Sequence, residues 1–98
     1  MTASPAVAIV TGGSKGIGLA ICQLFAAHHY QVFNLDVEDF ARPVPRGTWL
    51  SCDVSDSAQV GQAIQQVSSQ TDRIDALVSN AGVHFSGTLE QTSEADLD

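Results

Sequence analysis

The run Thr-Gly-Gly-Ser-Lys-Gly-Ile-Gly at positions 11–18 has the residue types and spacing that most clearly suggest chemistry in this sequence. Glycines at positions 12, 16 and 18 let a backbone come close to a ligand. If a helix begins here, its first N–H groups lack intrahelical partners and carry the positive end of the helix dipole, so they can hold a phosphate. The candidate binding residues of this run are Gly12, Ser14, Lys15, Gly16, Ile17 and Gly18.

Two alternatives to a dinucleotide phosphate site have to be weighed for this run. An ordinary tight turn between a strand and a helix also uses glycines, so the run taken alone is weak evidence. A phosphate loop of the Walker type requires Lys followed by Ser or Thr, whereas Lys15 is followed by Gly16. The run therefore needs support from the segments around it.

The segments on either side predict a strand and a helix that position the run. Residues 7–10, Val-Ala-Ile-Val, are typical of a strand buried on both faces of a parallel sheet. After the run, apolar residues recur at helical spacing, and we expect them to pack one face of a helix over about 16–28 on that sheet. The expected face comprises Ile17, Ala20, Ile21, Leu24, Phe25 and His28.

Polar residues follow three further predicted strands. Asp36 ends the strand 31–35 and lies 18 residues beyond Gly18, where a carboxylate can accept both hydroxyls of an adenosine ribose and would repel a 2′-phosphate. Asp53 and Val54 follow a strand over 48–52, and the acid there can receive an adenine amino group. A fourth strand, 76–79, runs into Asn-Ala-Gly at 80–82.

In this order and at these intervals, the motifs resemble the amino-terminal half of a short-chain dehydrogenase/reductase. The resemblance covers nearly the whole chain, and the Asn-Ala-Gly motif makes it specific, although Ser79 stands where the family usually has a first asparagine. It implies that Asp53 and Val54 contact adenine, and that Asn80 and Ala81, next to Gly82, contact the adjoining ribose. It also implies a homotetramer or homodimer and a small-molecule alcohol or ketone substrate.

The choice of cofactor depends on two residues. Lys15 resembles the basic residue that many NADP-preferring members place near the 2′-phosphate, whereas Asp36 occupies the position that marks NAD preference. A carboxylate close to a dianionic phosphate is strongly unfavourable in a partly desolvated cleft, and one exposed lysine contributes only about 1 kcal/mol. We therefore expect NAD rather than NADP.

The proton-transfer residues of the family have no counterpart in these 98 residues. The family uses a Tyr followed four positions later by Lys, together with a Ser upstream of that pair. Here the single tyrosine, Tyr30, is followed four positions later by Asn34, and the single lysine is Lys15. We therefore assign no catalytic residue and expect the 98 residues alone to be inactive.

Composition restricts the possible partners. The formal net charge is −7, without a basic run, which argues against binding to nucleic acid or anionic membranes. No apolar stretch approaches the roughly 18 residues of a spanning helix, and the start lacks a signal-like pattern, so we expect a cytoplasmic protein. Cys22 and Cys52 are interpreted as reduced, partly buried thiols, and no metal site is expected.

The alternation of strands and helices predicts an α/β fold, a Rossmann-type doubly wound parallel sheet with strand order 3-2-1-4. Residues 1–98 would form a single partial dinucleotide-binding domain that stops before the catalytic half. Pro43 and Pro45 predict that the helix usually found between the second and third strands is reduced to a turn or lost. A non-catalytic nucleotide-binding module of the same fold, or a methyltransferase using S-adenosylmethionine, remains as an alternative.

Overall fold

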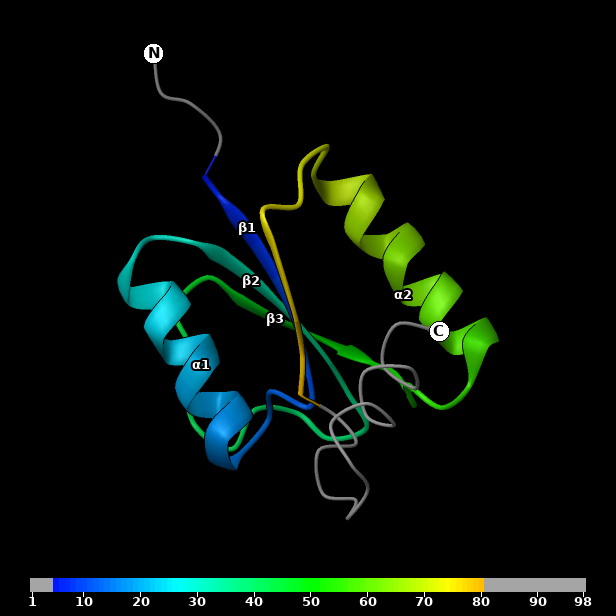
Figure 1. Cartoon of the computed structure of the whole chain (residues 1–98), viewed down its shortest axis with the longest axis horizontal. Helices are drawn as coiled ribbons and strands as arrows, with labels where there is room; N and C mark the ends of the chain where they lie inside the picture. Colours follow the sequence, from blue (N-terminus) through cyan, green and yellow to red (C-terminus); the bar gives the residue numbers. More distant parts are fainter. Residues whose placement is uncertain (1–4, 81–98) are drawn as a thin grey trace, which may run out of the picture.

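The structure is a computed structural model that describes residues 5–80 of the chain (Figure 1). Its elements, in chain order, are β1 (Val7–Thr11), α1 (Gly16–Ala27), β2 (Gln31–Asp36), β3 (Gly47–Ser51), α2 (Ser57–Gln70) and β4 (Ala76–Ser79). All strand pairs are parallel, and the sheet order is β3-β2-β1-β4. The predicted α/β fold, a partial Rossmann-type sheet with order 3-2-1-4, is confirmed.

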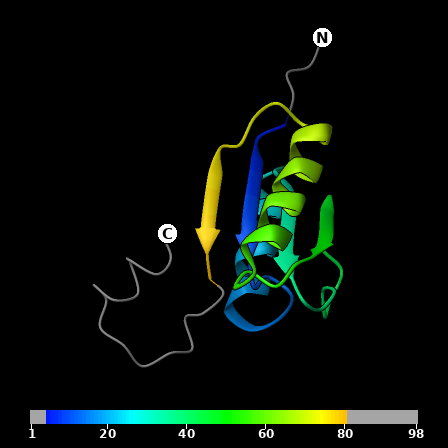
Figure 2. The same cartoon turned by 90° about the vertical axis from the view of Figure 1, so that its right-hand side faces the viewer.

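The two central strands are buried on both faces because a helix covers each side of the sheet (Figures 1 and 2). On the α2 side, Ile9 and Phe33 pack in one apolar cluster with Val67 of α2. On the α1 side, Val10 and Val32 form a second cluster with residues of α1. Consecutive residues of one strand, such as Ile9 and Val10, thus pack in clusters on opposite faces of the sheet, because side chains alternate between the faces along a strand.

The expected buried face of α1 is wrong in part. Ile17 and Leu24 are 74% and 61% exposed, whereas Gly18 and Cys22 are buried against the sheet. A Cβ on Gly18 would lie 2.0 Å from the Gly12 carbonyl oxygen, so α1 approaches the turn closely only with Gly18 facing it. This contact fixes the rotation of the helix, and the apolar residues that occur all round it could not indicate that rotation in the sequence.

Helix α2 covers the other face of the sheet and starts at a capping side chain. The Asp56 side chain caps it by accepting hydrogen bonds from the backbone N–H groups of Ala58 and Gln59 at 3.0 and 3.3 Å. Ala63 and Val67 are buried in the cluster with β1 and β2, and the glutamines of the opposite face are exposed. The cap and the 3.6-residue periodicity therefore determine both the start of this helix and its orientation.

The connection between β2 and β3 contains no helix, which confirms the prediction made from its two prolines. Phe40 and Val44 of this connection instead pack into the cluster under α1. The Arg46 Nη2 atom donates a hydrogen bond of 2.6 Å to the Ala26 carbonyl oxygen at the end of α1. Residues 37–46 therefore run along the α1 side and pass close to the turn between β1 and α1.

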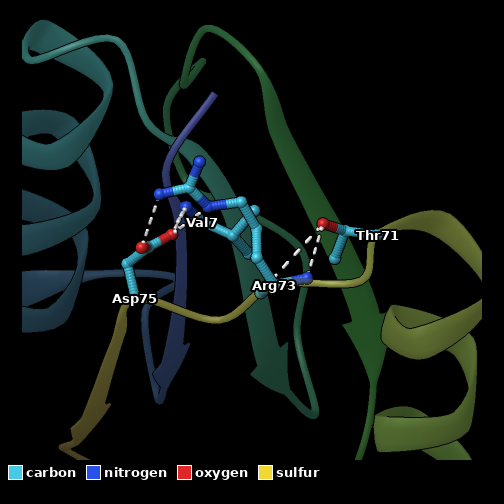
Figure 3. Close-up of polar contacts among 4 residues, drawn as sticks. All are labelled: Val7, Thr71, Arg73 and Asp75. Carbon is cyan, nitrogen blue, oxygen red and sulfur yellow. Dashed lines mark hydrogen bonds and ion pairs between the residues drawn. The ribbon is translucent and has the colours of Figure 1, made fainter. Parts of the chain in front are cut away.

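Asp75, just before β4, joins the amino ends of β1 and β4 by bonding to Val7 while it is paired with Arg73 (Figure 3). Arg73 donates from Nε and Nη2 to the Asp75 carboxylate at 2.9 and 2.7 Å. The Asp75 Oδ2 atom also accepts from the Val7 backbone N–H at 2.8 Å. The ion pair with Arg73, together with this bond, lowers the pKa of Asp75. The Asp75 carboxylate thus helps set the register of β4 on β1.

Candidate cofactor-binding site

Three loops meet where β1, β2 and β4 end, because parallel strands direct their carboxyl ends to one edge of the sheet. The Asn80 side chain donates from Nδ2 to the Gly12 carbonyl oxygen at 2.9 Å. The Ser14 backbone N–H donates to Asp36 Oδ2 at 3.2 Å. The structure therefore brings together the glycine run, Asp36 and Asn80, as the sequence predicted.

The glycine turn has a shape that side chains would prevent. Gly12 and Gly16 have φ angles of 67° and 61°, in the left-handed region that favours glycine. A Cβ on Gly18 would also lie 2.6 Å from Asn80 Nδ2. The Lys15 side chain makes no capping hydrogen bond at the start of α1, and within residues 5–80 no side chain accepts from the N–H groups of its first turn. This open helix start with close backbone approach fits a pyrophosphate.

Asn34 supports the turn from below, and sequence reasoning did not identify it as a site residue. Its side chain is fully buried; Oδ1 accepts from the Gly13 N–H at 2.8 Å, and Nδ2 donates to Ser14 Oγ at 2.9 Å. The Ser14 hydroxyl in turn donates to the Glu38 carbonyl oxygen. The sequence did hold a signal for this role: an amide within the otherwise apolar run of β2 would be buried, and a buried amide needs hydrogen-bond partners.

The Asp36 carboxylate is held at the end of β2 by backbone groups. Its Oδ1 atom accepts from the Val37 N–H at 2.7 Å, while Oδ2 accepts from Ser14. Each carboxylate oxygen can accept more than one hydrogen bond, so capacity remains for the two hydroxyls of a ribose. Because Asp36 lies beside the glycine turn, these free acceptor positions would be next to the expected pyrophosphate.

The sequence profile of the short chain dehydrogenase family matches residues 6–98. The chain belongs to the short-chain dehydrogenase/reductase family. Oxidoreductase UcpA of Salmonella typhimurium is 36% identical over 99 residues, which include 93% of this chain and 38% of UcpA. The 2,3-dihydro-2,3-dihydroxybenzoate dehydrogenase of Escherichia coli is 38% identical over 87 residues, which include 89% of this chain and 35% of that enzyme.

Among solved structures, the ligand-free aldohexose dehydrogenase of Thermoplasma acidophilum is similar, with a TM-score of 0.75 and 34% identity. That match covers 88% of this chain and 33% of the dehydrogenase. The chain therefore spans about a third of the length of these short-chain dehydrogenase relatives.

In this member of the short-chain dehydrogenase/reductase family, Lys15 forms an ion pair with Glu38. Its Nζ atom lies 3.7 Å from Glu38 Oε1, and the two side chains are 74% and 61% exposed. Ile17, in the first turn of α1, is exposed beside the open helix start. The structure thus places all the candidate residues of the glycine run around one helix start.

Asp53 and Val54 lie in the exposed turn between β3 and α2. The Asp53 Oδ1 atom accepts from the Ser55 hydroxyl and backbone N–H at 2.7 and 3.0 Å, and these bonds lower the pKa of its carboxyl. This turn shares the carboxyl edge of the sheet but is two strands from β1. Ala81 and Gly82 lie outside the described residues.

Tyr30 and the two cysteines have side chains whose types could do chemistry, and each has a structural place. Tyr30 comes before the amino end of β2, opposite the glycine turn, and its ring packs on Phe25 with centroids 4.8 Å apart. Cys22 and Cys52 are not disulfide-bonded and are buried more completely than the sequence predicted, and burial raises the pKa of Cys22 to about 11. Over the same range, we find no cluster of metal-ligating side chains. None of the helices described is long and apolar enough to cross a membrane.

Proposed function

We propose that these residues form the cofactor-binding part of an NAD-dependent short-chain oxidoreductase, which interconverts an alcohol and a ketone by hydride transfer. The observation that carries the proposal is the meeting of the uncapped α1 start, Asp36 and Asn80 at one sheet edge. The proposed cofactor-binding residues are Gly12, Ser14, Lys15, Gly16, Ile17, Gly18, Asp36, Asp53, Val54, Asn80, Ala81 and Gly82.

Each group of this site has a separate task in binding. The N–H groups at the start of α1 and the clearance at Gly12 and Gly18 accommodate the pyrophosphate. Asp36 accepts the ribose hydroxyls of the adenosine half, and Asp53 receives the adenine amino group. Asn80, fixed on the Gly12 carbonyl, borders the ribose of the other half. The bound nicotinamide supplies the hydride chemistry.

The preference for NAD follows from electrostatics at Asp36. A 2′-phosphate bound there would bring a dianion close to a carboxylate whose position two backbone N–H groups already fix. The repulsion grows as water leaves the site, because the effective dielectric constant falls. We propose NAD as the cofactor and NADP as the disfavoured one.

The substrate is proposed to be a small hydroxylated molecule or the matching ketone. Two relatives are named for such compounds, a dihydroxylated ring acid in Escherichia coli and an aldohexose in Thermoplasma acidophilum. Tyr30, the single tyrosine, lies at the opposite end of β2 from the site, so residues 1–98 are expected to bind cofactor without turnover. We further propose a cytoplasmic homodimer or homotetramer for the whole enzyme.

Titration with NAD⁺ and NADP⁺ tests this function directly. We expect NAD⁺ to bind at least about tenfold more tightly, a difference of about 1.4 kcal/mol. In an Asp36→Ala variant, the difference between the two dissociation constants should shrink because the repelling carboxylate is gone. Equal affinities in the wild type would contradict the NAD assignment, and binding of neither would contradict the cofactor site itself.

A further inference from the structure

Ser14 fastens the segment after β2 to the glycine turn. Its N–H donates to Asp36 Oδ2 at 3.2 Å, its hydroxyl donates to the Glu38 carbonyl oxygen, and its own carbonyl accepts from the Ala41 N–H at 2.7 Å. The Ser14 side chain is buried and also accepts from Asn34 Nδ2. We call Ser14 and residues 36–41, joined in this way, the Ser14 latch.

The latch places the Glu38 carboxylate beside Lys15. The Glu38 carbonyl is bonded to Ser14, and Lys15 is the residue that precedes α1, so both backbones are held before their side chains meet. The two charged groups lie 3.7 Å apart. An exposed ion pair usually contributes little because two long side chains must be ordered, and fixing both backbones reduces part of that cost.

The charged groups near Asp36 therefore disfavour the binding of a second anion, such as a 2′-phosphate. The latch carries the carboxylates of Asp36, Glu38 and Asp39, and within residues 5–80 the ion pair described for Lys15 is with Glu38. A 2′-phosphate would need to compete with Glu38 for the Lys15 ammonium group. A ribose hydroxyl does not need Lys15, since the Asp36 carboxylate can accept its hydrogen bond.

We propose that Glu38 is a second determinant of cofactor choice, which engages Lys15 and so selects against adenine dinucleotides that carry a 2′-phosphate. This inference rests on the proposed cofactor site. It assigns Lys15 a different effect from the one its residue type suggests, because a lysine paired with Glu38 favours NADP less than an unpaired lysine would.

A pair of matched variants tests the role of Glu38 by binding rather than by turnover. Glu38→Gln removes the paired carboxylate, and Asp39→Asn removes an equal charge one position away, where the side chain accepts from the Phe40 N–H. Dissociation constants for NAD⁺ and NADP⁺ are measured by calorimetry. Trp49, the single tryptophan, gives a second readout by fluorescence because its Nε1 atom donates to the Asp36 carbonyl oxygen at 2.9 Å.

We expect Glu38→Gln to tighten NADP⁺ binding by about three- to fivefold, with NAD⁺ changed by less than about twofold. The gain should fall at high salt, because salt screens the exposed lysine and the phosphate. It should also be absent from the Lys15→Met/Glu38→Gln double variant. Asp39→Asn should shift NADP⁺ binding less than Glu38→Gln does.

Three results would overturn the inference about Glu38 while leaving the cofactor site standing. They are an unchanged NADP⁺ affinity in Glu38→Gln, an equal shift in Asp39→Asn, and a gain that survives removal of Lys15. If the wild type binds neither dinucleotide, the proposed function fails, and the role of Glu38 fails with it.

Discussion

The side-chain amide of Asn80 donates a hydrogen bond of 2.9 Å to the carbonyl oxygen of Gly12, across 68 positions of the sequence. The Asn80 backbone N–H donates to Thr11 Oγ1, also at 2.9 Å. One residue thus ties the end of β4 to the turn that follows β1. The shape of the glycine turn consequently depends on the docking of β4.

Replacing Asn80 by Ala should weaken the binding of NAD⁺ by about fivefold, since one hydrogen bond contributes about 1 kcal/mol. Asn80→Asp should weaken it further, because a carboxylate would then face the Gly12 carbonyl oxygen. Calorimetric titration checks both variants. Ser79→Ala, which alters the exposed side chain before it, serves as the control and should bind like the wild type.

Gly18→Ala should destabilise the fold by about 2 kcal/mol or more and abolish binding of NAD⁺, because the new Cβ meets the backbone oxygen of Gly12 at 2.0 Å. Gly61 is the matched control. It lies in α2, where an added Cβ would meet nothing within 4 Å beyond the adjacent backbone of the helix, so Gly61→Ala should stabilise the fold by about 0.5–1 kcal/mol. Thermal unfolding followed by circular dichroism measures both, and a Gly18→Ala variant as stable as Gly61→Ala would refute the close approach.

Asn34→Leu should lower the free energy of unfolding by about 2–3 kcal/mol, because the buried Gly13 N–H loses its acceptor at 2.8 Å. Ser14→Ala removes the other partner of the same amide. In a double-mutant cycle, the double variant should lose less free energy of unfolding than the sum of the two single losses, because both changes break the same hydrogen-bond network. Additive costs would show that Asn34 and Ser14 act independently.

Acid should weaken the joint between β1 and β4 through Asp75. The folded-state pKa of Asp75 is lower than its ordinary value of 3.8, chiefly because of Arg73. Its bonds therefore stabilise the fold fully above that ordinary value, and this contribution is lost as pH falls through the lower folded-state pKa. Asp75→Asn should be less stable than the wild type at pH 7, and the difference should shrink toward pH 2.

The control for the acid experiment is Asp72→Asn, which removes a neighbouring exposed carboxylate and leaves the bonds to Val7 intact. Denaturant midpoints measured across the pH range give the comparison. A difference between Asp75→Asn and the wild type that stays constant down to pH 2 would contradict the assignment of this acid dependence to Asp75.

Local patterns in the amino-acid sequence determine much of this protein. The β-branched runs predict the strands, and the two prolines disfavour a helix between β2 and β3. The carboxyl-edge residues Asp36 and Asn80 can also be found, because strand ends can be located from sequence and parallel strands bring those ends together.

Only the tertiary structure decided how these pieces touch. The rotation of α1 follows from the contact of Gly18 with Gly12, and the support of the turn by Asn34 follows from the position of β2 beneath it. The pairing of Lys15 with Glu38 likewise depends on the Ser14 latch. Periodicity and composition report which residues prefer burial along one element, whereas close approaches and hydrogen bonds between elements arise from packing in three dimensions.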